Sequence, residues 1–360
     1  MQRPPALHFA LEVACGAIAV CACPLFGCGG RATIDRASGG AASSDAGSTT
    51  CGDTQSDMLN CGACGVVCPG TCNFGRCAVK VAPSQANVDC IAVDATSIYW
   101  INAGAALDEG SGELRKAPLG GGAFTTLATA PGMDIGWPCR MKVGHSSVYW
   151  TSGNIGGPVF RIPITGGTPQ MIAPLELGAT ALVLDDANVY WADPYAGVHE
   201  APLDGSTVTT LSMQGGSDIA VDGAHVYFTF NDEPKTDSTI TSLPLNGGTP
   251  ATLAGGLNDP VAIAADASGV YWVDYGTGSV ARAAPDGTIT TLASGQFNPR
   301  VIALDEANVY WDTLGSVMKI SKAGGAPTEL AISANVLDLA VDASSVYWTD
   351  GNQVLKVTPK

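Results

Sequence analysis

One pattern of apolar and polar positions recurs seven times along this chain. The seventh copy reads VDASSVYWTD from Val341 to Asp350, with β-branched and aromatic residues set between small and polar ones. The earlier copies, which share the aromatic ending, are 93–100, 143–150, 184–191, 221–228, 265–272 and 304–311. The apolar positions alternate with a period of two, which is typical of β-strands and differs from the 3.6-residue period of a helix.

The spacing of the copies predicts the architecture. Successive copies lie 37 to 50 residues apart. A unit of this length cannot bury its own apolar faces, so a period of about 40 residues predicts repeats that pack on one another. In the fifth copy we expect strands at 261–265, 270–274, 279–283 and 288–292. Four strands per repeat is the size of a propeller blade.

The turns between these strands carry their own residue preferences. Six copies place an aspartate six residues before the last aromatic, where we expect its side chain to accept backbone N–H groups; these are Asp94, Asp185, Asp222, Asp266, Asp305 and Asp342. The second copy has Gly144 there instead. The turn before each fourth strand is rich in glycine, which supplies the positive φ that a tight hairpin needs.

The last copy holds one strand too few. We expect strands at 339–341, 346–349 and 354–357, after which the sequence ends. Segment 77–82 is rich in β-forming residues and precedes the first copy, so we assign it as the missing fourth strand, which leaves no open sheet edge between the last blade and the first. The sequence therefore predicts an all-β fold, a seven-bladed β-propeller of four-stranded blades closed by an N-terminal strand and preceded by a small disulfide-rich module.

The aromatic endings carry a family resemblance. Residues 347–350 read YWTD, and 190–193 and 271–274 differ from that motif at one position each. From 77 to 360 the repeats resemble the YWTD and related NHL-like β-propellers. The resemblance implies the fold and places the recurring aromatic side chains between blades, rather than on a stacking platform for sugars or bases. Receptor-type YWTD domains have six blades, so seven copies argue against a receptor partner.

Composition separates one large domain from an N-terminal region. The chain has 360 residues and is 46% hydrophobic, which is enough for a sizeable core. We expect a signal peptide with a lipobox-like end at 1–28, a flexible tether at 29–50, a cysteine-rich module at 51–77 and the propeller at 78–360. The formal net charge of −16 repels phosphate backbones, so we expect no nucleic acid partner.

The N-terminal 50 residues predict export. An apolar run at 13–26, too short to span a bilayer, follows Arg3 and is typical of a signal peptide. The letters LFGC ending at Cys28 resemble a bacterial lipoprotein lipobox, which implies lipidation of Cys28 and a cell-envelope location, on the outer membrane or cell surface, with membrane contact only through the lipid. The alternative is ordinary cleavage nearby, with Cys28 removed or left as a thiol. Of residues 29–50, 17 of 22 are Gly, Ala, Ser or Thr, which is typical of a flexible tether.

Eight cysteines remain after the lipobox, an even number that predicts disulfides in an exported chain; they are Cys51, Cys61, Cys64, Cys68, Cys72, Cys77, Cys90 and Cys139. The first six fall within 27 residues and predict three disulfides, with the pairing open. A zinc site formed by Cys61, Cys64, Cys68 and Cys72 is the competing interpretation. The spacing also resembles the cysteine-rich module of the stigma-specific protein family, which implies an extracellular module without catalytic residues.

The last two cysteines stand at corresponding places in neighbouring repeats. Cys90 and Cys139 lie ten and eleven residues before the aromatics Trp100 and Trp150, at the entry to the first strand of each blade. We therefore predict a disulfide that links blades one and two. Two separate buried thiols are the alternative.

Catalytic motifs are missing from the sequence. It contains no Gly-x-Ser-x-Gly, no His-Glu-x-x-His and no phosphate-binding Gly-x4-Gly-Lys-Ser/Thr loop. His145, His199 and His225 show no metal-ligand spacing, and we interpret them as surface or turn residues.

Binding is instead expected in the loops at one mouth of the central channel. Loops that lead into the first strands supply the candidate ligand-binding residues Asn87, Trp137, Arg140, Asp218, Asp259, Asn298, Arg300 and Asn335. The same loops hold Asp89 and Asp338. Loops that follow the second strands belong to the same mouth and add Asp108, Glu109, Asp193, Tyr195, Asp232, Glu233, Asp274 and Tyr275.

These observations favour a non-enzymatic, monomeric binding or protein-interaction scaffold at the cell envelope, with an unidentified protein or carbohydrate ligand and no cofactor. The leading alternative is a lyase or lactonase-like hydrolase with a divalent metal at the channel mouth, where carboxylates would suit Ca²⁺. A structural envelope component without a ligand is the third possibility.

Overall fold

The computed structural model describes residues 53–59, 61–63, 66–85, 87–102, 112–129, 139–151, 157–173, 179–232, 234 and 237–360. The expected signal peptide, the tether and Cys28 lie outside these ranges. The described residues all belong to one compact unit, Thr50–Lys360. Within them, no helix is long and apolar enough to cross a membrane.

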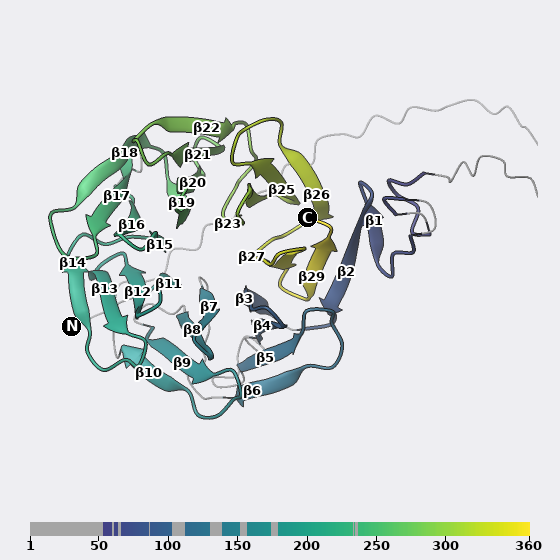
Figure 1. The fold of residues 1–360 in the computed structure, drawn as a ribbon, viewed down its shortest axis with the longest axis horizontal. Helices are drawn as coiled ribbons and strands as arrows, with labels where there is room; N and C mark the ends of the chain where they lie inside the picture. Colours follow the sequence, from purple (N-terminus) through teal and green to yellow (C-terminus); the bar gives the residue numbers. More distant parts are fainter. Residues whose placement is uncertain are drawn as a thin grey trace, which may run out of the picture. The chain divides into compact units, whose positions relative to one another are not determined.

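Antiparallel sheets repeat around a central axis (Figure 1). Blade one contains β3 (Val88–Val93), β4 (Ser97–Asn102), β5 (Glu113–Pro118) and β6 (Thr125–Thr129). Blade two contains β7 (Met141–Gly144), β8 (Ser147–Thr151), β9 (Val159–Pro163) and β10 (Gln170–Ala173). Blade three contains β11 (Ala181–Leu184), β12 (Asn188–Asp193), β13 (Gly197–Pro202) and β14 (Thr209–Ser212). Blade four contains β15 (Ile219–Val221), β16 (His225–Phe230), β17 (Ser238–Pro244) and β18 (Ala251–Leu257).

The remaining blades complete the ring. Blade five contains β19 (Pro260–Asp266), β20 (Gly269–Asp274), β21 (Ser279–Ala283) and β22 (Ile289–Ala293). Its strands overlap the four ranges expected from the sequence. Blade six contains β23 (Ile302–Leu304), β24 (Asn308–Thr313), β25 (Gly315–Ser321) and β26 (Thr328–Ser333). Blade seven contains β27 (Asp338–Val341), β28 (Val346–Thr349), β29 (Val354–Thr358), β2 (Arg76–Ala82) and β1 (Thr71–Asn73).

The closing strand lies where the sequence predicts it. Strand β2 pairs antiparallel with β29, from Cys77 opposite Thr358 to Ala82 opposite Val354. The last blade thus takes its fourth strand from the segment before the first blade, which confirms the predicted closure. Strand β1 adds a fifth strand that was not predicted. It forms a hairpin with β2 through Phe74 and Gly75, whose φ angles of 51° and 72° suit a two-residue hairpin loop.

The propeller core consists of seven clusters, one at each junction between neighbouring blades. In each cluster the tyrosine of one repeat packs with the tryptophan or phenylalanine of the next. Tyr347 and Trp100, for example, share the cluster between blades seven and one. The six tryptophans of the repeats are fully buried. The prediction that the recurring aromatics are inter-blade core is therefore confirmed, and these rings provide no ligand platform.

The repeated aspartate has a double role in its turn. Oδ1 of Asp342 accepts the backbone N–H groups of Ser344 and Ser345, both at 2.7 Å, as the sequence predicts. Its Oδ2 also accepts the Tyr347 hydroxyl at 2.7 Å, which was not predicted. Four further tyrosines donate to the aspartate of their own repeat in the same way; they are Tyr99, Tyr190, Tyr227 and Tyr310. One aspartate thus ties the turn to the inter-blade aromatic layer.

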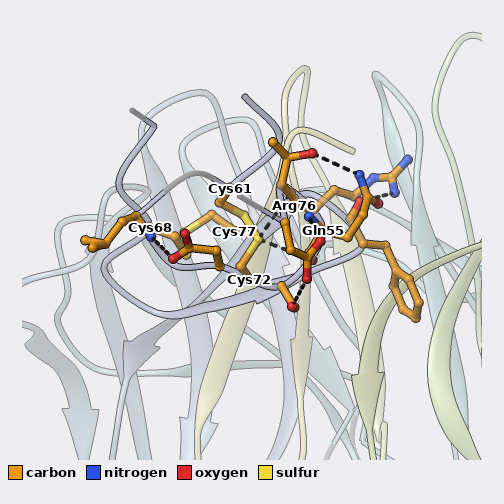
Figure 2. Close-up of a disulfide and its surroundings, with 12 residues drawn as sticks. Gln55, Cys61, Cys68, Cys72, Arg76 and Cys77 are labelled. Carbon is orange, nitrogen blue, oxygen red and sulfur yellow. Dashed lines mark hydrogen bonds between the residues drawn. A yellow bond between two sulfur atoms is a disulfide. The ribbon is translucent and has the colours of Figure 1, made fainter. Parts of the chain in front are cut away.

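The cysteines of the described residues form disulfides. Cys61 pairs with Cys72 and Cys68 pairs with Cys77, which holds the module to the base of β2 (Figure 2). The zinc interpretation is therefore wrong, because these sulfurs are bonded to one another. Cys51 and Cys64 lie outside the described residues. Cys90 pairs with Cys139, as predicted. Cys90 lies in β3 of blade one, and Cys139 lies directly before Arg140 and two residues before β7 of blade two.

Candidate functional site

The first strands of the blades surround a narrow central channel. Its cavity of about 320 Å³ is lined mainly by small and aliphatic side chains, such as Val93, Val143 and Val221. Lys142 is the one ionisable residue among the described residues that line it. The channel wall itself therefore offers few groups for recognition, and specific chemistry has to come from its mouths.

A wider cavity of about 510 Å³ lies at the mouth where the first strands begin. Six of the seven blades contribute to it, through loops that enter the first strand or leave the second and through Val261 near the start of β19. It is lined by Arg140, Thr180, Ser217, Asn231, Asp259, Val261, Tyr275, Arg300, Val301, Val336 and Leu337. This volume is within the range of small-molecule sites in proteins.

Three of the eight candidate ligand-binding residues meet at this cavity. They are Arg140, Asp259 and Arg300, joined by Tyr275 from a loop after a second strand. The structure brings them together from blades two, five and six. Asn87, Asp218, Asn298 and Asn335 do not line the cavity, and Trp137 lies outside the described residues. Thr180, Ser217 and Asn231 were missed, although their repeat positions match those of residues already named. Thr180 and Ser217 stand four residues before their repeat copies, as Arg300 does, and Asn231 stands three residues after its second-strand aromatic, as Tyr275 does.

Backbone conformation explains why several positions at this rim carry asparagine or aspartate. Asn87, Asp259 and Asn298 each stand six residues before the first residue of their repeat copy, and their φ angles are 52°, 63° and 51°. Asparagine and aspartate tolerate this left-handed region better than most residues with a β-carbon. These positions therefore make the turn into the first strand, and only Asp259 of the three also lines the cavity.

The two arginines give the cavity a local positive charge. Arg140 Nη1 donates to the carbonyl oxygen of Cys139 at 3.3 Å, and the guanidinium carbon of Arg300 lies 5.9 Å from the ring centre of Tyr275. Neither guanidinium forms an ion pair at contact distance with a carboxylate of the described residues. Both are half-buried, so their charges are screened less than those of exposed side chains.

Two buried aspartates lie beside this layer. Asp218 and Asp338 occupy the same repeat position as Arg140, three residues before the copies that begin at Val221, Val341 and Val143. Burial raises the pKa of both carboxyl groups, while the positive charge of Arg140 opposes that rise. Each accepts a backbone N–H from the next blade, so Asp218 acts in the junction between blades and not in the cavity wall.

Asp259 is held from the neighbouring blade. Asn231 Nδ2 donates to Asp259 Oδ1 at 3.0 Å and to Ser217 Oγ at 3.5 Å. The Oδ1 atom of Asn231 is buried and finds no hydrogen-bond partner in the described part of the chain. The amide and the carboxylate thus form one polar side of the cavity, with Ser217 at its edge.

The loop that carries Arg300 is anchored by Asp312. Oδ1 of Asp312 accepts the backbone N–H groups of Arg300 and Val301 at 2.6 and 2.8 Å. Burial raises the pKa of Asp312 to about 6, although these two hydrogen bonds and the Arg300 charge oppose the rise. Asp312 therefore fixes where Arg300 enters the cavity without lining the cavity itself.

The described residues provide no evident metal centre. No group of three or more His, Cys, Asp or Glu side chains among them is placed to hold a metal ion. His145 lies in a turn, as expected, and His225 begins β16 directly after one, but the surface interpretation of His199 is wrong. His199 is buried in β13, where it stacks on Trp191 at 5.5 Å between ring centres and its Nδ1 lies 3.1 Å from Thr210 Oγ1.

No protein-family model matches this chain, and no curated protein sequence matches it either. Similarity is found at the level of solved structures. Virginiamycin B lyase from Staphylococcus aureus superposes with a TM-score of 0.64 at 13% identity, covering 78% of this chain and 98% of that one.

Two further structures show the same architecture with other functions. The nidogen chain of a nidogen–laminin complex gives a TM-score of 0.51 at 20% identity, covering 69% of this chain and 96% of that one. A gluconolactonase from Xanthomonas campestris gives a TM-score of 0.51 at 10% identity, covering 79% and 90%. At these identities the similarity establishes the propeller fold, and the fold alone does not determine function.

Proposed function

We propose that this protein is an exported, lipid-anchored β-propeller that acts as a non-enzymatic binding protein and holds its ligand at the channel mouth. One observation carries the proposal. The cavity of about 510 Å³ collects two arginines, one aspartate, one tyrosine and small polar side chains from five blades. Residues so far apart in the sequence meet there, and a concave site with a few convergent polar groups is the usual form of a ligand site.

Export is supported by the disulfides. Cys61–Cys72, Cys68–Cys77 and Cys90–Cys139 are stable in oxidising compartments and rare in the cytosol. Together with the signal-like N-terminus and the lipobox-like sequence before Cys28, they favour a cell-envelope location. The flexible segment 29–50 would then hold the folded unit away from the membrane surface, with a root-mean-square reach of roughly 25 Å.

A ligand screen tests the proposed site directly. The full exported protein would be screened by ligand-observed NMR against a mixed set of small acids, bases, sugars and short peptides. The variant Ser217→Trp places a large ring in the cavity and should abolish binding of the molecules that the wild-type protein retains. The control Ala267→Trp adds the same ring to the exposed turn between β19 and β20, at the opposite end of the strands, and should leave binding unchanged.

Two results would count against the proposal. Binding that survives Ser217→Trp would place the ligand elsewhere on the molecule. A stoichiometric divalent metal ion in the purified protein that is lost on Asp259→Asn would instead favour the alternative function, a metal-dependent lyase or lactonase, because carboxylates suit a hard cation such as Ca²⁺. Elemental analysis of the wild-type protein and the variant separates the two functions.

A further inference from the structure

Among the described residues, the lining of the mouth cavity differs in charge from the chain as a whole. The sequence carries a formal net charge of −16, yet within the described ranges two arginines and one aspartate are the charged residues that line this cavity. Charged residues are rare in this chain, since only 14% of all residues are Asp, Glu, Lys or Arg, so two arginines in one cavity stand out. A cavity with a net positive lining in an acidic protein attracts anions locally and concentrates them at one place.

Both arginines keep hydrogen-bond donors for a ligand. A guanidinium has five N–H donors, and the described contacts of Arg140 use one of them, for the carbonyl oxygen of Cys139. No side-chain hydrogen bond of Arg300 is found within the described ranges, where its guanidinium packs near the Tyr275 ring. The two groups come from different blades, so an anion between them would also bridge blades two and six.

The surroundings set the size and charge of that anion. Asp259 lies in the same cavity and would repel a second negative charge, and the buried Asp218 and Asp338 lie close enough to Arg140 to feel its charge. A singly charged group is therefore favoured over a phosphate dianion. The carboxylate is the anion that matches the planar fork of arginine.

The rest of the wall suits a carbon skeleton. Val261, Val301, Val336 and Leu337 give the cavity an apolar lining, and Asn231 and Asp259 add groups that can form hydrogen bonds. Resting on the proposed function, we infer that the mouth cavity binds a small organic carboxylate whose charged group is held by Arg140 and Arg300. The apolar side chains then cover its carbon skeleton, and Asn231 with Asp259 can accommodate a hydroxyl group on it.

Matched pairs of probes test the ligand class. Calorimetry at low salt would compare 4-phenylbutyrate with 4-phenylbutyramide and D-glucuronate with D-glucose, since each pair differs in the charged group. We expect at least one carboxylate to bind about tenfold or more tightly than its neutral counterpart. We expect Arg140→Gln and Arg300→Gln each to remove about tenfold of that affinity or more.

Two kinds of variant keep the test specific. Arg161→Gln removes the same charge outside the cavity, where Arg161 contacts Gln170 and the Leu203 carbonyl, and should change affinity less than about twofold. Arg140→Lys preserves the charge beside Asp218 and Asp338 but not the fork. If Arg140 only balances the charges of those aspartates, Arg140→Lys binds carboxylates like the wild type. Arg140→Gln then lowers stability without a selective loss of carboxylate binding. These two results together would overturn the inference.

The remaining outcomes separate this inference from the proposed function. If neither carboxylate binds at millimolar concentration, or each binds no more tightly than its neutral counterpart, the ligand class is wrong. Neutral molecules whose binding is blocked by Ser217→Trp would then still support a ligand site at the mouth. If no molecule of the screen binds in a way that depends on Ser217→Trp, the proposed function itself fails.

Discussion

Asp338 and Ile91 join the last blade to the first. The Asp338 carboxylate accepts the backbone N–H of Ile91 at 3.1 Å, although the two residues lie 247 positions apart. Asp218 makes the corresponding bond with Ile263 of the next blade at 2.9 Å. Each bond supplies an acceptor to an inner strand at or next to an irregularity in the ladder of its own sheet. The ring is thus closed at its inner edge by a side chain and at its outer edge by strand β2.

Replacement of Asp338 should separate the hydrogen bond from the charge. In Asp338→Ala the Ile91 N–H loses its buried acceptor, and we expect the free energy of unfolding at pH 7 to fall by about 1–3 kcal/mol. In Asp338→Asn the amide oxygen can still accept from Ile91 and the cost of burying a charge disappears, although the Leu339 N–H loses the second carboxylate oxygen. Urea unfolding should therefore place Asp338→Asn above Asp338→Ala. Equal losses in both variants would show that the negative charge itself is needed.

The pairing of Tyr347 with Asp342 predicts sensitivity to acid. Burial alone would raise the pKa of Asp342, but hydrogen bonds from the Ser344 and Ser345 N–H groups and the Tyr347 hydroxyl bring it below its ordinary value. A lowered pKa gives stability that is present above the unfolded-state pKa and is lost as the pH falls through the folded-state value. We therefore expect the free energy of unfolding to decrease as the pH drops below about 4.

Phenylalanine variants can test this pairing. Tyr347→Phe removes a hydrogen bond to a charged group, which should lower the free energy of unfolding at pH 7 by about 1–3 kcal/mol and reduce its loss in acid. Tyr149→Phe is the matched control, because Gly144 replaces the aspartate in that repeat and the Tyr149 hydroxyl donates to the neutral Leu203 carbonyl at 3.3 Å. Its acid dependence should equal that of the wild type; a change as large as that of Tyr347→Phe would refute the explanation.

Asp312 predicts the opposite dependence on pH. Burial raises its pKa to about 6, so the folded state holds the proton more tightly than the unfolded state does. This group therefore lowers stability as the pH rises from about 4 to about 6 and has no further effect above that. Asp312→Asn keeps an oxygen for the Arg300 and Val301 N–H groups. We expect it to be more stable at pH 7 by about 1–3 kcal/mol, with the difference vanishing below about pH 4.

Guanidinium unfolding curves across this pH range would measure the effect. The exposed Glu306→Gln serves as the control, since it removes a carboxylate without relieving burial. A stability difference between Asp312→Asn and the wild type that stays constant from pH 4 to pH 7 would show that titration of Asp312 is not its cause.

The sequence was informative where one physical requirement recurs in every blade. Strand positions, turn aspartates and buried aromatics repeat because each blade buries the same faces against its neighbours. The closing strand followed from counting strands, and β2 pairs with β29 as expected. The Cys90–Cys139 link followed from comparing places in adjacent repeats.

Features that depend on a single contact were missed. The indole N–H groups of Trp100, Trp311 and Trp348 donate to side chains that stand 15 residues earlier, namely Gln85, Gln296 and Ser333. That constant separation could have revealed them. Repeat position could also have revealed part of the cavity, because Thr180 and Ser217 stand eleven residues before Trp191 and Phe228, as Arg300 does before Trp311. Val336 and Leu337 resemble ordinary core residues in the sequence.

The lipobox-like segment predicts a covalent anchor on Cys28. Cells that express the full chain and are fed a palmitate analogue should incorporate label into the protein, and Cys28→Ser should abolish it. The variant should also partition into the soluble fraction, since the chain would then lack its lipid. Label that persists in Cys28→Ser would refute the lipobox assignment and favour ordinary cleavage.

The Cys90–Cys139 disulfide connects stability with the proposed binding site. It closes a loop between residues 49 positions apart and joins two blades, so we expect the Cys90→Ala/Cys139→Ala variant to lose about 2–4 kcal/mol of unfolding free energy. Both cysteines are buried, so thiol reductants should act slowly on the folded protein.

Because Arg140 follows Cys139 and donates to its carbonyl oxygen, the Cys90→Ala/Cys139→Ala variant should also bind carboxylates more weakly. Removal of Cys61–Cys72, which lies in the module, is the matched control and should leave that affinity unchanged. Calorimetry on both variants, at a temperature where each is folded, decides whether the inter-blade disulfide positions Arg140 or only stabilises the ring.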